Sequence, residues 1–214
     1  MHLKKKIGFM RGIFTGIFLF ALITASFGQK SKTDKDYIKS VNKERKEKDK
    51  EFIDADNSPL DPKYRKSFSG LNYFKVDPYW RINARIETNE KPDTIKMKTT
   101  TERLPLYIVY GKAYFTVNGN SCELTIYRNV GLMSKPDYED YLFVPFRDKT
   151  SGDKSYGGGR YVDARIMEGD HVIIDFNKAY NPYCVYSKKY SCPVPPSENY
   201  LEVEVTAGEK DFAH

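Results

Sequence analysis

The stretch YIVYGKAYFTVNGNSCELTIYR, residues Tyr107–Arg128, decides the fold. Two runs rich in β-branched and aromatic residues, Tyr107–Val117 and Cys122–Arg128, flank the pair Asn118 and Gly119. An Asn-Gly pair adopts the positive φ angles that a tight two-residue turn needs. The stretch therefore predicts an antiparallel β-hairpin.

Further short strands are expected on both sides of this hairpin. Trp80–Glu87 alternates apolar and polar residues, the period of a strand with one buried face. Weaker strand patterns occur at Thr94–Thr101, Tyr141–Phe146, Val162–Ile166, Val172–Phe176 and Leu201–Ala207. Pro145 argues against a central position for its strand, because proline donates no ladder hydrogen bond. The pattern predicts an all-β fold, an antiparallel sandwich or barrel, in a single domain over residues 57–214.

A charged segment, residues 29–56, precedes this domain. Between Lys30 and Glu51 it carries nine basic and six acidic residues. Mixed charges at short spacing are typical of a solvated helix with pairs four residues apart. We expect a solubilising helical arm that becomes regular toward Phe52, where its apolar end can dock on the domain.

The first 28 residues have the composition of a secretory signal peptide. Four basic residues precede an apolar core, Gly12–Thr24, and small residues follow at Ser26 and Gly28. The apolar run is shorter than the ~20 residues that span a bilayer, which favours removal over an anchor. We expect cleavage after Gly28, an exported protein in the periplasm or outside the cell, and membrane contact only before cleavage.

Charge and histidine content limit the partners. Removal of residues 1–28 lowers Lys and Arg from 35 to 31 against 29 Asp and Glu, so the net charge falls from +6 to +2. A nucleic-acid partner is therefore not expected. His171 and His214 are not at metal-ligand spacing from another histidine or cysteine, so neither a metal site nor a cofactor is expected.

Two of the three cysteines lie in the segment DFNKAYNPYCVYSKKYSCPVPPSEN, residues 175–199. In an exported protein, Cys184 and Cys192 are the candidate disulfide, which would contribute roughly 2–3 kcal/mol by closing a short loop. The alternative, a thiol enzyme, needs a base, and His171 is the only candidate. Cys122 is expected to be a buried small hydrophobe.

Polar candidates lie in two neighbouring segments. The loop Arg147–Asp163 contains three consecutive glycines, and the planar guanidinium of Arg160 in it can bind a carboxylate or phosphate through two bonds. Asp175 and Asn177 share one face of a strand, which is either solvated or lines a barrel mouth.

Several strings of the chain resemble the bacterial and archaeal family called domain of unknown function 1684. They are FVPFRDKTSGDKSYGGGRY, the segment of residues 175–205 and the closing AGEK, with NSPL and FSGLNYFKVDPYWRINA upstream. Val185 stands where the family has a small residue. The resemblance implies a single, mostly β domain, and it implies no activity, cofactor or catalytic residue.

We therefore expect an exported β domain that binds a small polar ligand, a glycan or an anionic metabolite, between residues 147–163 and 175–199. The candidate ligand-binding residues are Asp148, Tyr156, Arg160, Asp175, Asn177, Tyr180, Asn181 and Glu198. One alternative is a hydrolase that uses carboxylates among Asp148, Asp175 and Glu198. Another is a structural module whose polar residues bond one another to hold loops.

Overall fold

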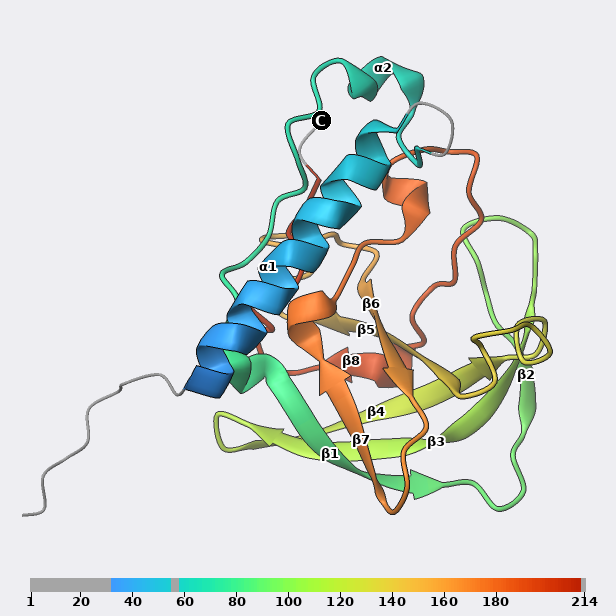
Figure 1. The fold of residues 1–214 in the computed structure, drawn as a ribbon. Coiled ribbons are helices and arrows are strands. Elements are labelled where there is room, and N and C mark those ends of the chain that lie inside the picture. The colour runs from blue at the N-terminus through green and yellow to red at the C-terminus, as the bar shows by residue number, and fades with distance from the viewer. Residues whose placement is uncertain (1–31, 55–57, 213–214) are drawn as a thin grey trace, which may run out of the picture. The chain divides into compact units, whose positions relative to one another are not determined.

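The computed structural model describes residues 32–54 and 58–212 (Figure 1). The predicted signal peptide lies outside the described residues. The helices are α1 (Lys32–Ile53) and α2 (Pro62–Arg65), with single 3-10 turns at Pro78–Trp80, Phe176–Lys178, Tyr183–Val185 and Ser197–Asn199. The strands are β1 (Arg81–Thr88), β2 (Thr94–Lys96), β3 (Leu106–Val117), β4 (Asn120–Asn129), β5 (Tyr141–Asp148), β6 (Arg160–Arg165), β7 (His171–Asp175) and β8 (Tyr200–Leu201).

The strands form a nearly closed barrel. Six antiparallel strands run in the order β6-β5-β4-β3-β1-β7, while β2 pairs with β3 and β8 pairs in parallel with β5. In the end strand β6, Tyr161 exchanges backbone hydrogen bonds of 2.9 and 3.0 Å with Tyr180, which lies five residues beyond the other end strand, β7. The all-β prediction is confirmed, and of the two expected architectures the barrel is the one formed (Figure 1).

The predicted hairpin forms the centre of the sheet. Strands β3 and β4 pair over ten positions around Asn118 and Gly119, whose φ angles are +50° and +79°. A side chain at Gly111, beside the β-bulge of β3, would lie 2.4 Å from the carbonyl oxygen of Glu87 on β1. Glycine therefore permits β1 and β3 to pack closely where the barrel curves.

The barrel interior is filled by the inward side chains of these strands. Ala84, Leu124, Val144, Val162 and Ile174 are among its fully buried members. A second hydrophobic cluster, formed by Met97, Tyr107, Tyr127, Phe143 and Tyr161, lies apart from this core. Because strand side chains alternate, neighbours of the core residues point to the outer wall, and this wall carries the candidate site described below.

Pro145 lies in an interior strand, contrary to the expectation from sequence. Strand β5 lies between β4 and β6, but only Tyr127 and Phe143 are register partners between β4 and β5 in the described part of the chain. The side-chain amide of Asn199 occupies the opening: it accepts from Thr125 N at 2.8 Å and donates to the carbonyls of Thr125 and Pro145 at 2.8 and 2.7 Å. The Asn199 amide thus bonds to backbone groups of β4 and β5 that do not pair with each other beside Pro145.

Helix α1 is packed against the barrel along its length: its apolar end at Phe52 docks as expected, but the expectation that the rest is only a solubilising arm is wrong. Tyr37, Val41, Arg45, Lys48 and Phe52 follow one another at spacings of four and three, which places them on one helical face. Arg45 donates to the carbonyls of Phe74 and Asn177 at 2.8 and 2.9 Å, and Val41 and Phe52 are buried. Within the described residues, no helix combines the length and apolar composition that crossing a bilayer requires.

Candidate functional site

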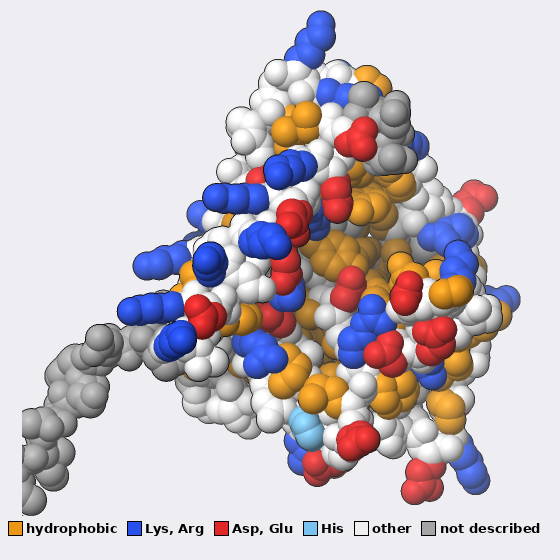
Figure 2. Space-filling view, in the orientation of Figure 1, with side chains coloured by type: hydrophobic (Ala, Val, Ile, Leu, Met, Phe, Trp, Pro, Cys, Tyr) orange, Lys and Arg blue, Asp and Glu red, His pale blue; other side chains and the backbone are white. Residues whose placement is uncertain are grey.

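A cleft lined by tyrosines lies on the outer wall of the barrel. Tyr141 and Phe143 on β5 and Tyr161 and Asp163 on β6 alternate with core residues, so they point outward. The segment from Tyr180 to Pro193 folds back over these strands and forms the opposite wall. Figure 2 shows a hollow of hydrophobic side chains beside helix α1, with charged side chains at its rim.

Eight aromatic rings line this cleft, which encloses about 480 Å³. They pack in chains: the ring centroids of Phe143 and Tyr161 are 4.8 Å apart, and those of Tyr161 and Tyr180 are 5.7 Å apart. The complete set is Tyr107, Tyr138, Tyr141, Phe143, Tyr161, Tyr180, Tyr183 and Tyr190. The cleft has the volume and aromatic lining of sites that bind small molecules.

Asp163 supplies a carboxylate at the edge of the rings. Its Oδ1 accepts hydrogen bonds from the hydroxyls of Tyr141 and Tyr180, each at 2.7 Å. Burial, and then the negative charge of Asp163, raise the pKa of both tyrosines above the ordinary tyrosine value. Both phenols therefore keep their protons to a higher pH than a free tyrosine, and Asp163 itself remains exposed to solvent.

Lys48 of α1 also lines the cleft, beside Tyr180. Its ammonium is 4.8 Å from the centroid of the Tyr180 ring and forms a 2.8 Å ion pair with Glu209, whose side chain is 1% exposed. Glu209 also accepts hydrogen bonds from Tyr186 Oη at 2.6 Å and from the backbone N–H of Asn181 at 2.8 Å. The charge of Lys48 is therefore compensated within the protein.

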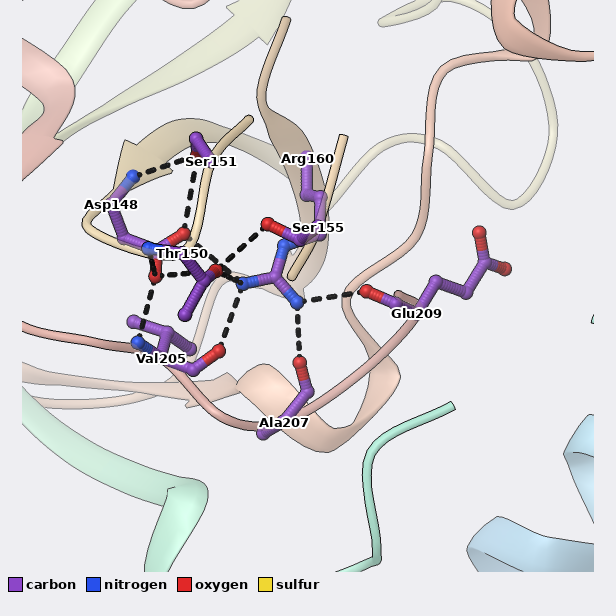
Figure 3. Close-up of polar contacts among 8 residues, drawn as sticks. All are labelled: Asp148, Thr150, Ser151, Ser155, Arg160, Val205, Ala207 and Glu209. Atoms are coloured by element: carbon purple, nitrogen blue, oxygen red, sulfur yellow. Dashed lines mark hydrogen bonds and ion pairs between the residues drawn. The ribbon is translucent and has the colours of Figure 1, made fainter. Parts of the chain in front are cut away.

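Arg160 and Asp148, two of the residues expected to bind ligand, instead form a buried ion pair of 3.1 Å with both side chains 0% exposed. The two terminal nitrogens of Arg160 also donate to Thr150 and to the carbonyls of Val205, Ala207 and Glu209 (Figure 3). Both nitrogens are thus occupied by protein acceptors. Burial lowers the pKa of Arg160, and the charge of Asp148 opposes this effect.

This ion pair also explains why the predicted strand Leu201–Ala207 is mostly irregular. Only Tyr200 and Leu201 belong to β8, although Val203, Val205 and Ala207 are buried as the alternating pattern indicated. At Val205 the backbone bonds to side chains: its N–H donates to Asp148 at 2.7 Å, and its carbonyl accepts from Arg160 at 2.9 Å. The side chains of Asp148 and Arg160 therefore supply the hydrogen-bond partners that a neighbouring strand would supply to Val205.

Asp175 and Asn177 lie together through the 3-10 turn that follows β7 and not along one face of a strand, and helix α1 covers them. Tyr37 Oη donates to both oxygens of Asp175 at 2.7 and 2.9 Å, and Asn177 Nδ2 donates to Tyr37 Oη at 3.1 Å. Asn177 also exchanges two bonds with the backbone of Asp77. These groups hold the helix on the barrel.

The other predicted residues are dispersed. Asn181 is buried and donates its amide to Lys210 O at 2.8 Å, and exposed Glu198 accepts from Tyr127 at 3.1 Å. Tyr156 lines a separate pocket beside Cys184, and only Tyr180 lies in the tyrosine-lined cleft. The eight predicted residues thus do not line one cavity, and the carboxylates considered for hydrolysis lie in three different environments.

The predicted disulfide is not formed in this structure, where all three cysteines are free thiols. Cys184 and Cys192 are nevertheless neighbours, because the backbone N–H of Cys184 donates to Cys192 Sγ at 3.2 Å. Hydrogen bonding from the Cys192 thiol lowers the pKa of Cys184 to about 7. The same bond, together with burial, raises the pKa of Cys192.

The sequence contained a signal for the cleft that the expectations did not use. Alternation in β5 and β6 assigns Tyr141, Phe143, Tyr161 and Asp163 to one face, opposite the core residues. Lys48 and Tyr190 had no such signal, because they reach the cleft from α1 and a loop distant in sequence. Among the described residues there is no cluster of three or more side chains suited to a metal ion.

Comparison with known proteins shows the family. The sequence model described as "Protein of unknown function (DUF1684)" matches residues 66–210. The chain belongs to the DUF1684 family. This confirms the resemblance seen in the sequence, and the DUF1684 match includes β1–β8 but begins after α1.

One similar solved structure is the solution NMR structure of the uncharacterized protein from gene locus rrnAC0354 of Haloarcula marismortui. The two sequences are 39% identical, and the alignment covers 84% of this chain and 97% of that chain with a TM-score of 0.65. No curated protein is significantly similar to this DUF1684 chain.

Proposed function

We propose that this protein is an exported, carbohydrate-binding β-barrel whose ligand lies in the tyrosine-lined cleft. The observation that carries the proposal is the convergence of eight aromatic rings with the carboxylate of Asp163 in one cavity. The export part rests on the composition of residues 1–28.

The chemistry of the cleft suits a sugar. The C–H faces of a sugar ring are apolar and pack on aromatic faces, while its hydroxyls need polar partners at the edge. Tyrosine supplies an apolar ring with a polar tip, and the exposed side of Asp163 can accept from hydroxyls. The cleft therefore presents both kinds of surface.

An anionic metabolite, the other ligand class expected from sequence, is less well matched. Lys48 is the only Lys or Arg among the described residues that line the cleft, and Glu209 already compensates its charge. Asp163 contributes a negative charge to the same cleft. A neutral ligand fits this balance better than an anion.

A carbohydrate array followed by isothermal titration calorimetry tests the proposal. We expect a neutral oligosaccharide to bind, and Tyr183→Ala or Tyr190→Ala to weaken binding about tenfold, which corresponds to roughly 1.4 kcal/mol. Asp163→Asn is expected to weaken binding but to retain the fold, because the amide keeps an oxygen that can accept from Tyr141 and Tyr180.

Tyr200→Ala is the matched control, because Tyr200 is exposed to a similar degree as Tyr183, 42% against 44%, and does not line the cleft. It should bind like the wild type. The proposal fails if no carbohydrate binds, or if the bound sugar responds equally to Tyr200→Ala and Tyr183→Ala.

A further inference from the structure

Six lysines form a straight stripe on helix α1. Their spacings along the chain are three, four, four, three and four residues, which keeps them on one helical face. At 1.5 Å per residue, the stripe is about 27 Å long. Its members are Lys32, Lys35, Lys39, Lys43, Lys46 and Lys50, and all six are exposed.

The lysine stripe lies opposite the face that packs on the barrel. Lys39 and Lys43 each follow a docking residue, Tyr37 and Val41, by two positions, about 200° around the helix axis. Because the docking face is held by hydrogen bonds and buried side chains, the stripe points into solvent. Figure 2 shows Lys and Arg side chains projecting in a row along this helix.

Charge is segregated between the stripe and the rest of the protein. Residues 29–214 contain 31 Lys and Arg and 29 Asp and Glu, so removing the six stripe lysines leaves 25 against 29, a net charge of −4. Acidic residues flank the stripe, and Lys43 lies 3.7 Å from Glu47, but both side chains are largely exposed. Exposed ion pairs are weak, so Glu47 does not neutralise Lys43 firmly. The stripe remains a basic surface on an otherwise acidic protein.

We propose that the lysine stripe is a binding surface for an anionic lipid bilayer, on which α1 lies parallel to the membrane plane. Lysine ammonium groups are point charges that suit mobile anionic head groups. Each lysine that lies near an anionic membrane surface strengthens binding to it. Nucleic-acid sites use arginine forks and stacking aromatics, and the stripe has neither. This proposal does not rest on the carbohydrate-binding proposal.

The position of the stripe in the sequence supports a membrane as the partner. Seven residues separate Thr24, the end of the apolar run, from Lys32. A chain of that length reaches at most about 25 Å when extended. Whenever the apolar run is in a bilayer, the stripe is therefore within reach of the head groups. The proposal extends the expectation from sequence, in which membrane contact ended with cleavage.

Vesicle co-sedimentation tests the proposal with residues 29–214, which contain all three hydrophobic clusters of the fold. Vesicles of phosphatidylcholine alone are compared with vesicles containing equal parts of phosphatidylcholine and phosphatidylglycerol. We expect at least tenfold tighter binding to the anionic vesicles at low salt, and loss of that difference at high salt.

The stripe variant replaces Lys35, Lys39, Lys43 and Lys46 by glutamine, which preserves helix propensity. We expect it to lower the affinity for anionic vesicles more than tenfold. The matched control replaces four exposed lysines elsewhere, Lys66, Lys75, Lys91 and Lys98, with the same change in net charge, and should reduce affinity less than threefold. Circular dichroism confirms that both variants are folded.

Three outcomes would overturn the proposal. The first is wild-type protein that does not prefer anionic vesicles at low salt. The second is a stripe variant and a control variant with equal affinity, which would assign binding to overall charge. The third is tighter binding to a short duplex DNA or RNA than to anionic vesicles at the same salt, which would identify a nucleic acid as the partner.

Discussion

The hydroxyl of Tyr37, on the first helix, donates a hydrogen bond of 2.7 Å to the carboxylate of Asp175 at the end of β7, 138 residues later in the chain. Asn177, two residues beyond, donates to the same hydroxyl at 3.1 Å. A polar pair that sequence alone made a ligand candidate is thereby the attachment point of α1. Asp175, Asn177 and Tyr37 satisfy one another, as buried polar groups generally do.

Removing the Tyr37 hydroxyl should loosen helix α1. We expect Tyr37→Phe to lower the free energy of unfolding by roughly 1.5–3 kcal/mol, the usual contribution of a hydrogen bond to a charged group. Urea denaturation measures the change. Ser40→Ala, on the exposed side of the same helix, should change stability by less than about 0.5 kcal/mol. Equal effects of the two substitutions would contradict the role of the Tyr37–Asp175 bond.

Breaking the buried ion pair should be much more costly. Arg160→Met leaves Asp148 buried without its partner and removes bonds to the backbone of residues 205–209. We expect it to lower the free energy of unfolding by roughly 3–5 kcal/mol. The control is Lys112→Met, which breaks a 2.8 Å pair with Glu123 whose side chains are 45% and 50% exposed. Lys112→Met should lower the free energy of unfolding by at most about 1 kcal/mol. Similar losses in chemical denaturation would refute the structural role of Arg160.

The two neighbouring thiols should differ in reactivity. Because hydrogen bonding from Cys192 lowers the pKa of Cys184, Cys184 should be the thiol of the pair that forms thiolate more readily. Cys192, with a raised pKa, stays protonated. Brief iodoacetamide treatment of the reduced, folded protein at neutral pH, followed by peptide mass spectrometry, should label Cys184 first. Preferential labelling of Cys192 would reverse the assignment. A parallel sample is treated without prior reduction. If that sample takes up no label, its two thiols have been oxidised to the disulfide expected from sequence.

Alkaline pH should destabilise the fold. The pKa of Tyr37 is raised by burial and then by its bond to Asp175, and the pKa of Tyr141 by burial and then by the charge of Asp163. An unfolded tyrosine titrates near 10, so below that pH both states hold the proton and the stabilisation is complete. Above about pH 10 the unfolded chain releases protons that the folded protein retains, and the free energy of unfolding falls.

Urea titrations at several values between about pH 8 and 11 measure this slope. Tyr37→Phe should make the decline shallower, because it removes one of the groups responsible. An unfolding free energy that is constant or rises through this range would contradict the raised tyrosine pKa values.

The sequence predicted the local elements of the fold better than its long-range contacts. Alternation and the Asn118-Gly119 turn were enough for the hairpin and for β1, because both depend on neighbours in the chain. The position of Pro145 in the interior of the sheet was not predictable, because it depends on the side chain of Asn199, 54 residues away. The irregular path after Leu201 likewise depends on Arg160.

The candidate site was only partly predictable for the same reason. Polar residues of the glycine loop and of the segment 175–199 were expected to bind a ligand, but in the structure the side chains of Asp148, Arg160 and Asp175 bond to the protein itself. The cleft instead combines outward residues of β5 and β6 with Lys48 of α1 and with the loop around Tyr190. Such a combination depends on which side-chain faces point outward from the barrel and on which segments cover them. The local periodicity of the sequence carries no information on either.

The ion pair between Lys48 and Glu209 has a consequence for where this protein can be divided. The family match begins at residue 66, whereas Lys48 belongs to α1, which ends at Ile53. A fragment cut at the family boundary would retain the buried carboxylate of Glu209 and lose the ammonium that neutralises it. It would also expose Asp175 and Asn177, which Tyr37 now covers. We therefore expect a fragment cut at the family boundary to be less stable than one that keeps α1, because the helix partners buried groups of the barrel.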